Sequence, residues 1–274
     1  MTTAGVDVGD GLRLHVTRAG EGPPVVLLHG FTGSGDTWRG LATSLADRFS
    51  TIAVDLPGHG QSSAPAAPAR YALPRFADDL ATLLDALALD RVALLGYSMG
   101  ARAALHVARR HPDRLRALVL ESASPGIAEP AARAARVAQD ASLAAAIERE
   151  GIEAFVSRWE RLPLWESQAS LPPAARERLR AQRLAGSVQG LANSLRGAGA
   201  GVEPPLHDQL GAIALPVLLV AGALDAKYVA LAQLMAARLP WPRLEVVEAA
   251  GHAVHLERPA AFARLVADFL TGVA

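Results

Sequence analysis

The chain has 274 residues, of which 51% are hydrophobic, so it is long enough to bury the core of one large α/β domain or two small ones. Its 27 basic residues balance its 27 acidic residues without a basic block, which argues against nucleic acid or an anionic membrane as the main partner. It contains no cysteine, which excludes disulfides and thiolate chemistry.

Predicted strands and helices alternate through the first half of the chain. Residues 11–17 alternate apolar and polar side chains, which is typical of an edge strand. Nearly continuous apolar runs predict strands that are buried on both faces: 24–30, 51–54, 92–95 and 115–120. Apolar residues at helical spacing predict the helices between them: about 37–46, 74–89 and 99–110. This order predicts a mostly parallel central sheet with helices on both faces.

The alternation resumes late in the chain. It predicts strands at 216–221 and 244–247, and helices at about 228–239 and 259–270. The residues between the two halves contain no convincing strand and read as amphipathic helices interrupted by prolines. We therefore predict an α/β core domain made of residues 1–126 and 211–274, with residues 127–210 inserted as a helical lid over the site.

The motif that indicates catalysis is Gly96-Tyr97-Ser98-Met99-Gly100, which joins a predicted strand to a predicted helix. This Gly-x-Ser-x-Gly pattern is the nucleophile elbow of the α/β-hydrolase fold, a strained turn that lifts the serine hydroxyl above the sheet. The strand–turn–helix context makes the signal specific, because five residues alone arise often by chance. We predict that Ser98 is catalytic.

A serine hydroxyl needs a histidine to take its proton and a carboxylate to orient that histidine. On this fold the partners follow in the order serine, acid, histidine, each after a strand. Asp225 and His252 stand at those places. Glu121 also ends a predicted strand and is the alternative acid, whereas His255 suits a supporting role.

The oxyanion site needs two backbone N–H donors. Met99 supplies one from the start of its helix, and Phe31, after the early strand, is the expected second donor. The other histidines are dispersed and no pair has metal-ligand spacing, so we predict no metal site.

Three arginines are candidates for binding an anionic substrate. Arg102 lies one helical turn after Ser98, and Arg136 and Arg183 lie in the predicted lid. Each could equally be a solvated surface residue. Clustered guanidinium groups would suit a substrate with several carboxylates, because the arginine fork binds a carboxylate through two N–H groups.

Residues of the predicted lid indicate one particular family among the α/β-hydrolases. Residues 29–33, 55–60 and 96–100 are shared with many α/β-hydrolases, but residues 159–168, with Trp159 and Pro163, and residues 183–204 look like lid signatures of one family. Residues 224–228 look like its acid loop. Over nearly its whole length the chain resembles the 2-succinyl-6-hydroxy-2,4-cyclohexadiene-1-carboxylate synthases, lyases of menaquinone biosynthesis.

The resemblance implies roles for particular residues. Ser98, Asp225 and His252 would form the triad, and the backbones of Phe31 and Met99 would line the oxyanion site. The residues implied to contact the substrate are Tyr97, Arg102, Arg136, Trp159 and Arg183. The implied reaction is an elimination of pyruvate in which Ser98, activated by His252, removes a ring proton. It requires no metal and no organic cofactor.

Two other functions remain open at this point. A serine esterase or C–C hydrolase would use the same triad through an acyl-enzyme, and a non-catalytic ligand-binding protein would not need the triad at all. The amino terminus lacks a leader pattern, and no apolar run approaches the roughly 20 residues of a membrane span. We expect a cytoplasmic monomer or weak homo-oligomer that binds a small anionic molecule, with neither nucleic acid nor membrane as partner.

Overall fold

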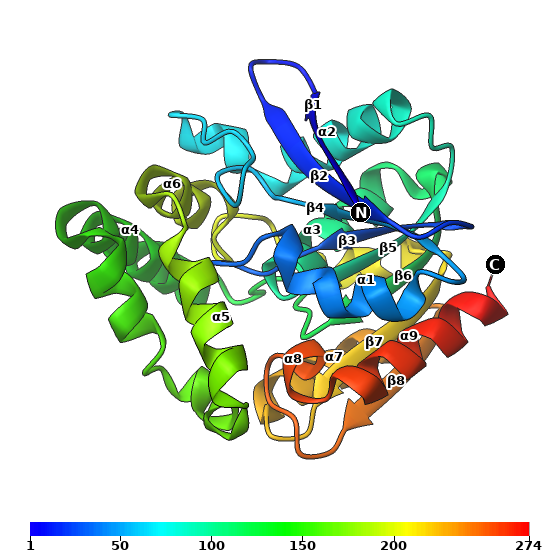
Figure 1. The fold of residues 1–274 in the computed structure, drawn as a ribbon. Helices are drawn as coiled ribbons and strands as arrows, with labels where there is room; N and C mark the ends of the chain where they lie inside the picture. The colour runs from blue at the N-terminus through cyan, green and yellow to red at the C-terminus, as the bar shows by residue number, and fades with distance from the viewer. Residues whose placement is uncertain (274) are drawn as a thin grey trace.

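The computed structural model describes residues 1–273, which form a single eight-stranded sheet with helices on both faces (Figure 1). The strand order is β1-β2-β4-β3-β5-β6-β7-β8; the first two pairings are antiparallel and all others are parallel. The strands are β1 (Thr2–Asp7), β2 (Arg13–Ala19), β3 (Pro24–Leu28), β4 (Ser50–Val54), β5 (Val92–Tyr97), β6 (Leu115–Glu121), β7 (Pro216–Gly222) and β8 (Trp241–Val247). The predicted α/β fold class is confirmed.

The edge of the sheet differs from the prediction. The strand expected at 11–17 is β2, which pairs on both sides, so it is not an edge strand. The true edge is β1, which the sequence analysis missed because its side chains are mostly exposed and show no apolar alternation. Backbone pairing from Thr2↔Arg18 to Asp7↔Arg13 forms this strand, and glycines with positive φ at Gly9 and Gly11 close the hairpin.

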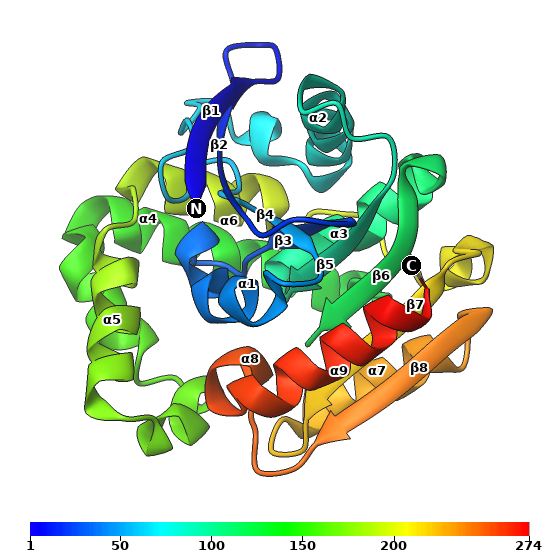
Figure 2. The ribbon, with the colours of Figure 1, turned by 45° about the vertical axis from the view of Figure 1, so that its right-hand side comes forward.

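Alternate side chains of the buried strands pack into two separate hydrophobic cores, one on each face of the sheet. On one face, Val26, Leu28 and Leu94 pack under α2 (Leu73–Ala86), α3 (Met99–Arg110) and α7 (Ala226–Ala236). On the other face, Leu27 and Leu95 pack under α1 (Arg39–Leu45) and α9 (Pro259–Gly272). Figure 2 shows α1 and α9 together in front of the strands. The period of two in a strand therefore decides which of its side chains face each layer of helices.

The segment predicted to be a lid, residues 127–210 and called the lid below, leaves the sheet between β6 and β7 and contains no strand in the described chain. It holds α4 (Pro130–Trp159), α5 (Pro173–Leu184) and α6 (Val188–Ala198), which lie to one side of the sheet in Figure 1. α4 bends at Gly151, where φ is 81°. Ile147, Phe155 and Leu191 lie in an apolar cluster of the lid's own, and Phe31 of the core packs against it.

Short helices complete the fold. They are α8 (Val254–Glu257) and the 3-10 helices η1 (Gly35–Trp38), η2 (Pro68–Tyr71), η3 (Pro112–Arg114), η4 (Pro163–Ser170) and η5 (His207–Ala212). α8 begins two residues after His252, and η4 of the lid packs near it. Among residues 1–273, no helix combines the length and the apolar character that a membrane crossing requires.

Candidate active site

Ser98 lies at a sharp turn between β5 and α3. Its φ of 52° and ψ of −107° are unusual for a residue with a side chain, and such strain costs on the order of 1–3 kcal/mol. The turn is possible because its flanking positions are glycines: a Cβ on Gly96 would overlap the carbonyl oxygen of Gly100, and one on Gly100 would overlap that of Leu28. The turn sets Ser98 at the N-terminus of α3, where the helix dipole favours negative charge.

His252 bridges Ser98 and Asp225. Its Nε2 lies 3.0 Å from Ser98 Oγ, and its Nδ1 lies 2.7 Å from Asp225 Oδ2. Asp225 follows β7 and caps α7, where a carboxylate oxygen accepts from the N–H of Tyr228 at 3.3 Å. With Nδ1–H donated to Asp225, Nε2 of the neutral imidazole is the acceptor that faces the serine hydroxyl. The arrangement can move a proton from Ser98 to His252.

Glu121, the alternative acid, has a different partner. Its carboxylate oxygens both lie 2.9 Å from His255 Nδ1, and one accepts from the His255 backbone N–H at 3.0 Å. Both side chains are buried. The carboxylate that contacts His252 is that of Asp225.

The loop after β3 lies beside the elbow. A Cβ built on Gly30 would contact both the Tyr97 ring and Ser98 Cβ. In the part of the chain that the structure describes, the N–H groups of Phe31 and Met99 donate no hydrogen bond to another residue. The two predicted oxyanion donors therefore come from segments that meet at Ser98 and are free to bind a negative oxygen.

Two buried histidines support this loop. His29 Nδ1 lies 2.7 Å from the carbonyl of Gly30, and its Nε2 accepts from the N–H of Leu56 at 3.0 Å. The ring of His59 lies 5.2 Å from that of His29. Burial lowers the pKa of His29 to about 4 and that of His59 to about 3, so both rings are neutral at pH 7.

These histidines predict acid sensitivity. His29 binds a proton below about pH 6.5 in the unfolded chain but only near pH 4 in the folded protein. Protonation therefore favours unfolding, and stability is lost as the pH falls from 6.5 toward 4, by about 3 kcal/mol for His29 alone. Urea unfolding at several pH values between 7 and 4.5 should show this slope, and His29→Gln should reduce it, leaving the contribution of His59. An equally steep slope in His29→Gln would show that other groups cause it.

Aromatic rings surround His252. The rings of Tyr97 and Tyr228 lie 5.4 and 4.5 Å from it, and that of Trp165 lies 5.6 Å from it. The ring centre of Trp159 lies 5.8 Å from that of Trp165 and 5.4 Å from that of Phe31. Sequence reasoning did not select Trp165 or Tyr228 as site residues. Their signals were present, since Trp165 lies in the first lid signature and Tyr228 is the last residue of the acid loop.

Arg183 reaches the site from α5. Its guanidinium lies 5.3 Å from the centre of the Trp165 ring, and its N–H groups face Glu160 at 3.2 Å and Gln168 at 3.3 Å. The Arg183 residue is only 5% exposed, and burial lowers its pKa. A guanidinium this deeply placed is part of the interior and not a solvated surface group.

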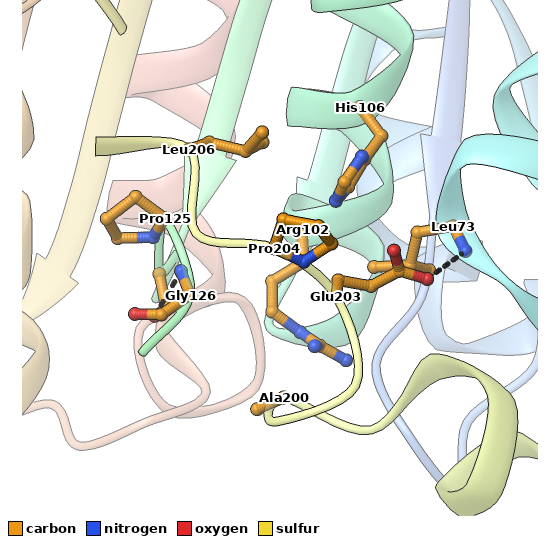
Figure 3. A pocket seen from close by; sticks show the side chains of 10 residues that line it. Leu73, Arg102, His106, Pro125, Gly126, Ala200, Glu203, Pro204 and Leu206 are labelled. Carbon is orange, nitrogen blue, oxygen red and sulfur yellow. Dashed lines mark hydrogen bonds between the residues drawn. The ribbon is translucent and has the colours of Figure 1, made fainter. Parts of the chain in front are cut away.

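Arg102 points toward the lid. It donates to the carbonyl of Ala198 at the end of α6, and no carboxylate within residues 1–273 lies at ion-pair distance from it. Burial lowers its pKa to about 10. It lines a small pocket with Glu203, whose carboxylate turns away to accept from the N–H of Leu73 at 2.9 Å (Figure 3). The Arg102 residue is only half-buried, and with no carboxylate at ion-pair distance in the described chain its guanidinium can bind an anionic group.

Arg136 is placed differently. Its Nε donates to Asp140 at 2.8 Å on the same helix, and its side chain is 39% exposed. It lies near Arg102, and the positive charge of Arg136 also lowers the pKa of Arg102. No group of three or more potential metal ligands occurs among the described residues.

Comparison with known proteins places the chain in a family. A model described as the alpha/beta hydrolase fold matches residues 23–259. The chain is 44% identical, over 100% of both chains, to a Bacillus subtilis (strain 168) protein provisionally named 2-succinyl-6-hydroxy-2,4-cyclohexadiene-1-carboxylate synthase. The chain belongs to this synthase family of the α/β-hydrolase superfamily. A synthase of Serratia proteamaculans (strain 568) is 32% identical, over 94% of this chain and 98% of its own.

Solved structures agree with the family assignment. MenH from S. aureus superposes with a TM-score of 0.89 at 35% identity, over 94% of this chain and 98% of its own. A thermophilic esterase from Thermogutta terrifontis has a TM-score of 0.87 at 27% identity, over 100% of this chain and 99% of its own. The esterase shares the scaffold, so the fold by itself does not select the reaction.

Proposed function

We propose that the protein is the carbon–oxygen lyase of menaquinone biosynthesis that eliminates pyruvate from 2-succinyl-5-enolpyruvyl-6-hydroxy-3-cyclohexene-1-carboxylate. The ring product is 2-succinyl-6-hydroxy-2,4-cyclohexadiene-1-carboxylate. The observation that carries this proposal is the 44% identity over both full lengths to a protein named for that synthase activity. We also propose that the enzyme works in the cytoplasm, and its state as a monomer or weak homo-oligomer stays a prediction.

The proposed chemistry is proton abstraction followed by loss of a leaving group. Ser98 Oγ takes a ring proton as its own proton passes to His252 Nε2, and Asp225 stabilises the imidazolium. The released electron pair forms the second ring double bond as the bond to the enolpyruvyl oxygen breaks. The departing enolate takes up a proton and becomes pyruvate. The N–H groups of Phe31 and Met99 would face the negative charge that develops.

The proposed substrate accounts for the arginines. It carries carboxylates on the ring, on the succinyl chain and on the enolpyruvyl group, and Arg102 has no carboxylate of its own in the described chain. Arg183 and Trp159, with Tyr97, would line the remaining wall, and Arg136 would need to exchange Asp140 for substrate. Bidentate guanidinium contacts would hold the several anionic groups.

A second candidate is a serine esterase or C–C hydrolase of a small carboxylated substrate. The specific observation in its favour is that Ser98 Oγ lies 3.0 Å from His252 Nε2, which also suits attack on a carbonyl carbon. The shared scaffold with an esterase points the same way. The two functions differ in product, because a lyase releases pyruvate without consuming water.

A coupled assay for pyruvate decides between them. The wild-type protein, supplied with the enolpyruvyl substrate, should release pyruvate far above the rate without enzyme and produce one equivalent of the diene. In parallel, p-nitrophenyl esters should be hydrolysed only slowly. Pyruvate release no faster than the uncatalysed reaction would refute the lyase, and rapid ester hydrolysis would then select the hydrolase.

A further inference from the structure

The side chain of Glu257 is an unusual buried acid. The residue is 8% exposed, and no cation lies at ion-pair distance from its carboxylate within the described residues. Its two hydrogen bonds come from the backbone: Gly251 N–H donates to Oε2 at 2.7 Å and Ala253 N–H donates to Oε1 at 3.4 Å. The two N–H groups belong to the residues on either side of His252. A carboxylate buried without a cation is costly, so its presence calls for a reason.

A second side chain holds the carbonyl side of the same residue. Ser122, at the end of β6, is 1% exposed and donates its hydroxyl to the backbone oxygen of His252 at 2.8 Å. Its φ of 48° lies in the left-handed region, which disfavours a residue with a side chain. Its own N–H is tied to the carbonyl of Val220 in β7. A strained backbone therefore aims this hydroxyl at His252.

The two contacts together fix the backbone of the triad histidine. Glu257 comes from α8 and Ser122 directly follows β6, so they restrain His252 from separate segments of the chain. The imidazole must stay aligned with Asp225 and Ser98 while a proton moves along it, and a misplacement of about 1 Å can cost about 100-fold in rate. Among the hydrogen bonds of the described residues, none joins the side chain of Glu257 or Ser122 to Ser98 or Asp225.

We propose that Glu257 and Ser122 are positioning residues that hold His252 in register with Ser98 and Asp225. The proposal rests on the proposed function only in that the reaction uses His252 as the proton acceptor. The competing explanation is that Glu257 merely stabilises the start of α8, in which case its loss would lower stability and leave the chemistry unchanged.

The test compares two substitutions that remove the same charge. In Glu257→Gln, the amide can accept from one flanking N–H but presents its own donors to the other. The matched control is Glu248→Gln, an exposed residue of the preceding loop. Pyruvate release by folded Glu257→Gln should show kcat lowered by about 10- to 100-fold with KM within about twofold of wild type. Glu248→Gln should match wild type in both constants.

A second measurement does not depend on the substrate. A fluorophosphonate probe bonds its phosphorus to Ser98 Oγ, releases fluoride and sends the serine proton to His252, so its labelling rate reports the Ser98–His252 pair. This rate should fall in Glu257→Gln in parallel with kcat. The low-field proton resonance of His252 Nδ1–H should also shift or broaden. If wild type labels rapidly but releases no pyruvate, the proposed function fails while the positioning role is still measured.

Ser122→Ala covers the case in which Glu257→Gln does not fold. It removes only the hydroxyl that binds the His252 carbonyl, and we expect the labelling rate and kcat to fall by about tenfold with KM unchanged. Wild-type kcat and labelling in either folded variant would overturn the proposal for that residue. A raised KM with unchanged kcat would overturn it too, because that result locates the effect in substrate binding.

Discussion

Replacing Ser98 with alanine is expected to reduce pyruvate release by about 10²- to 10⁴-fold, the range that a general base contributes. The substitution removes the hydroxyl that lies 3.0 Å from His252 Nε2 and leaves the backbone and the Cβ in place. Steady-state kinetics of the coupled assay measure the loss. The melting temperature and substrate affinity should stay near those of wild type, because the hydroxyl makes its hydrogen bond within the catalytic group and not with the core.

A glycine at the same position provides the matched comparison. Ser98→Gly removes the hydroxyl and also relieves the strain of a side chain at a φ of 52°. We expect it to be as inactive as Ser98→Ala but more stable, by about 1 kcal/mol. Pyruvate release at the wild-type rate in both variants would show that Ser98 is not the base. Equal stability would show that the turn is not strained.

Replacing Arg102 with alanine is expected to lower kcat/KM for pyruvate release by about 100-fold, or about 3 kcal/mol, while stability changes little. The guanidinium has no carboxylate partner in the described chain, and burial already lowers its pKa to about 10. Removing it loses the bond to the Ala198 carbonyl but also removes the desolvation of an unpaired charge, so the two effects on stability oppose each other.

Arg196→Ala is the control for this prediction. Arg196 lies in α6, the helix whose Ala198 carbonyl accepts from Arg102, but it pairs with Glu148 on the exposed side of the lid. An exposed pair contributes little, so activity and stability should both stay close to wild type. If Arg102→Ala instead unfolds the protein and its folded fraction turns over normally, Arg102 is a structural residue. Retained stability with weakened substrate binding supports its role in the site.

The buried strands, the turn at Ser98 and the order of the triad residues can all be predicted from local sequence patterns. Apolar runs marked the buried parallel strands because a strand covered on both faces has no polar side to show. The Gly-x-Ser-x-Gly pattern marked the turn because only glycine avoids backbone overlap at Gly96 and Gly100. The order of Ser98, Asp225 and His252 followed from where strands end, which is a property of the chain.

Other features required the tertiary structure. β1 escaped prediction because backbone pairing with β2 stabilises it, and its side chains carry almost no signal. The sequence left Glu121 open as an acid, and only the packing of α8 against β6 brings it to His255. The sequence does not distinguish the arginines, but in the structure Arg136 pairs with Asp140, whereas Arg102 is half-buried with no carboxylate at ion-pair distance in the described chain. Charge pairing and burial depend on residues distant in the chain, so sequence specifies the elements and three-dimensional packing decides which polar groups they bring together.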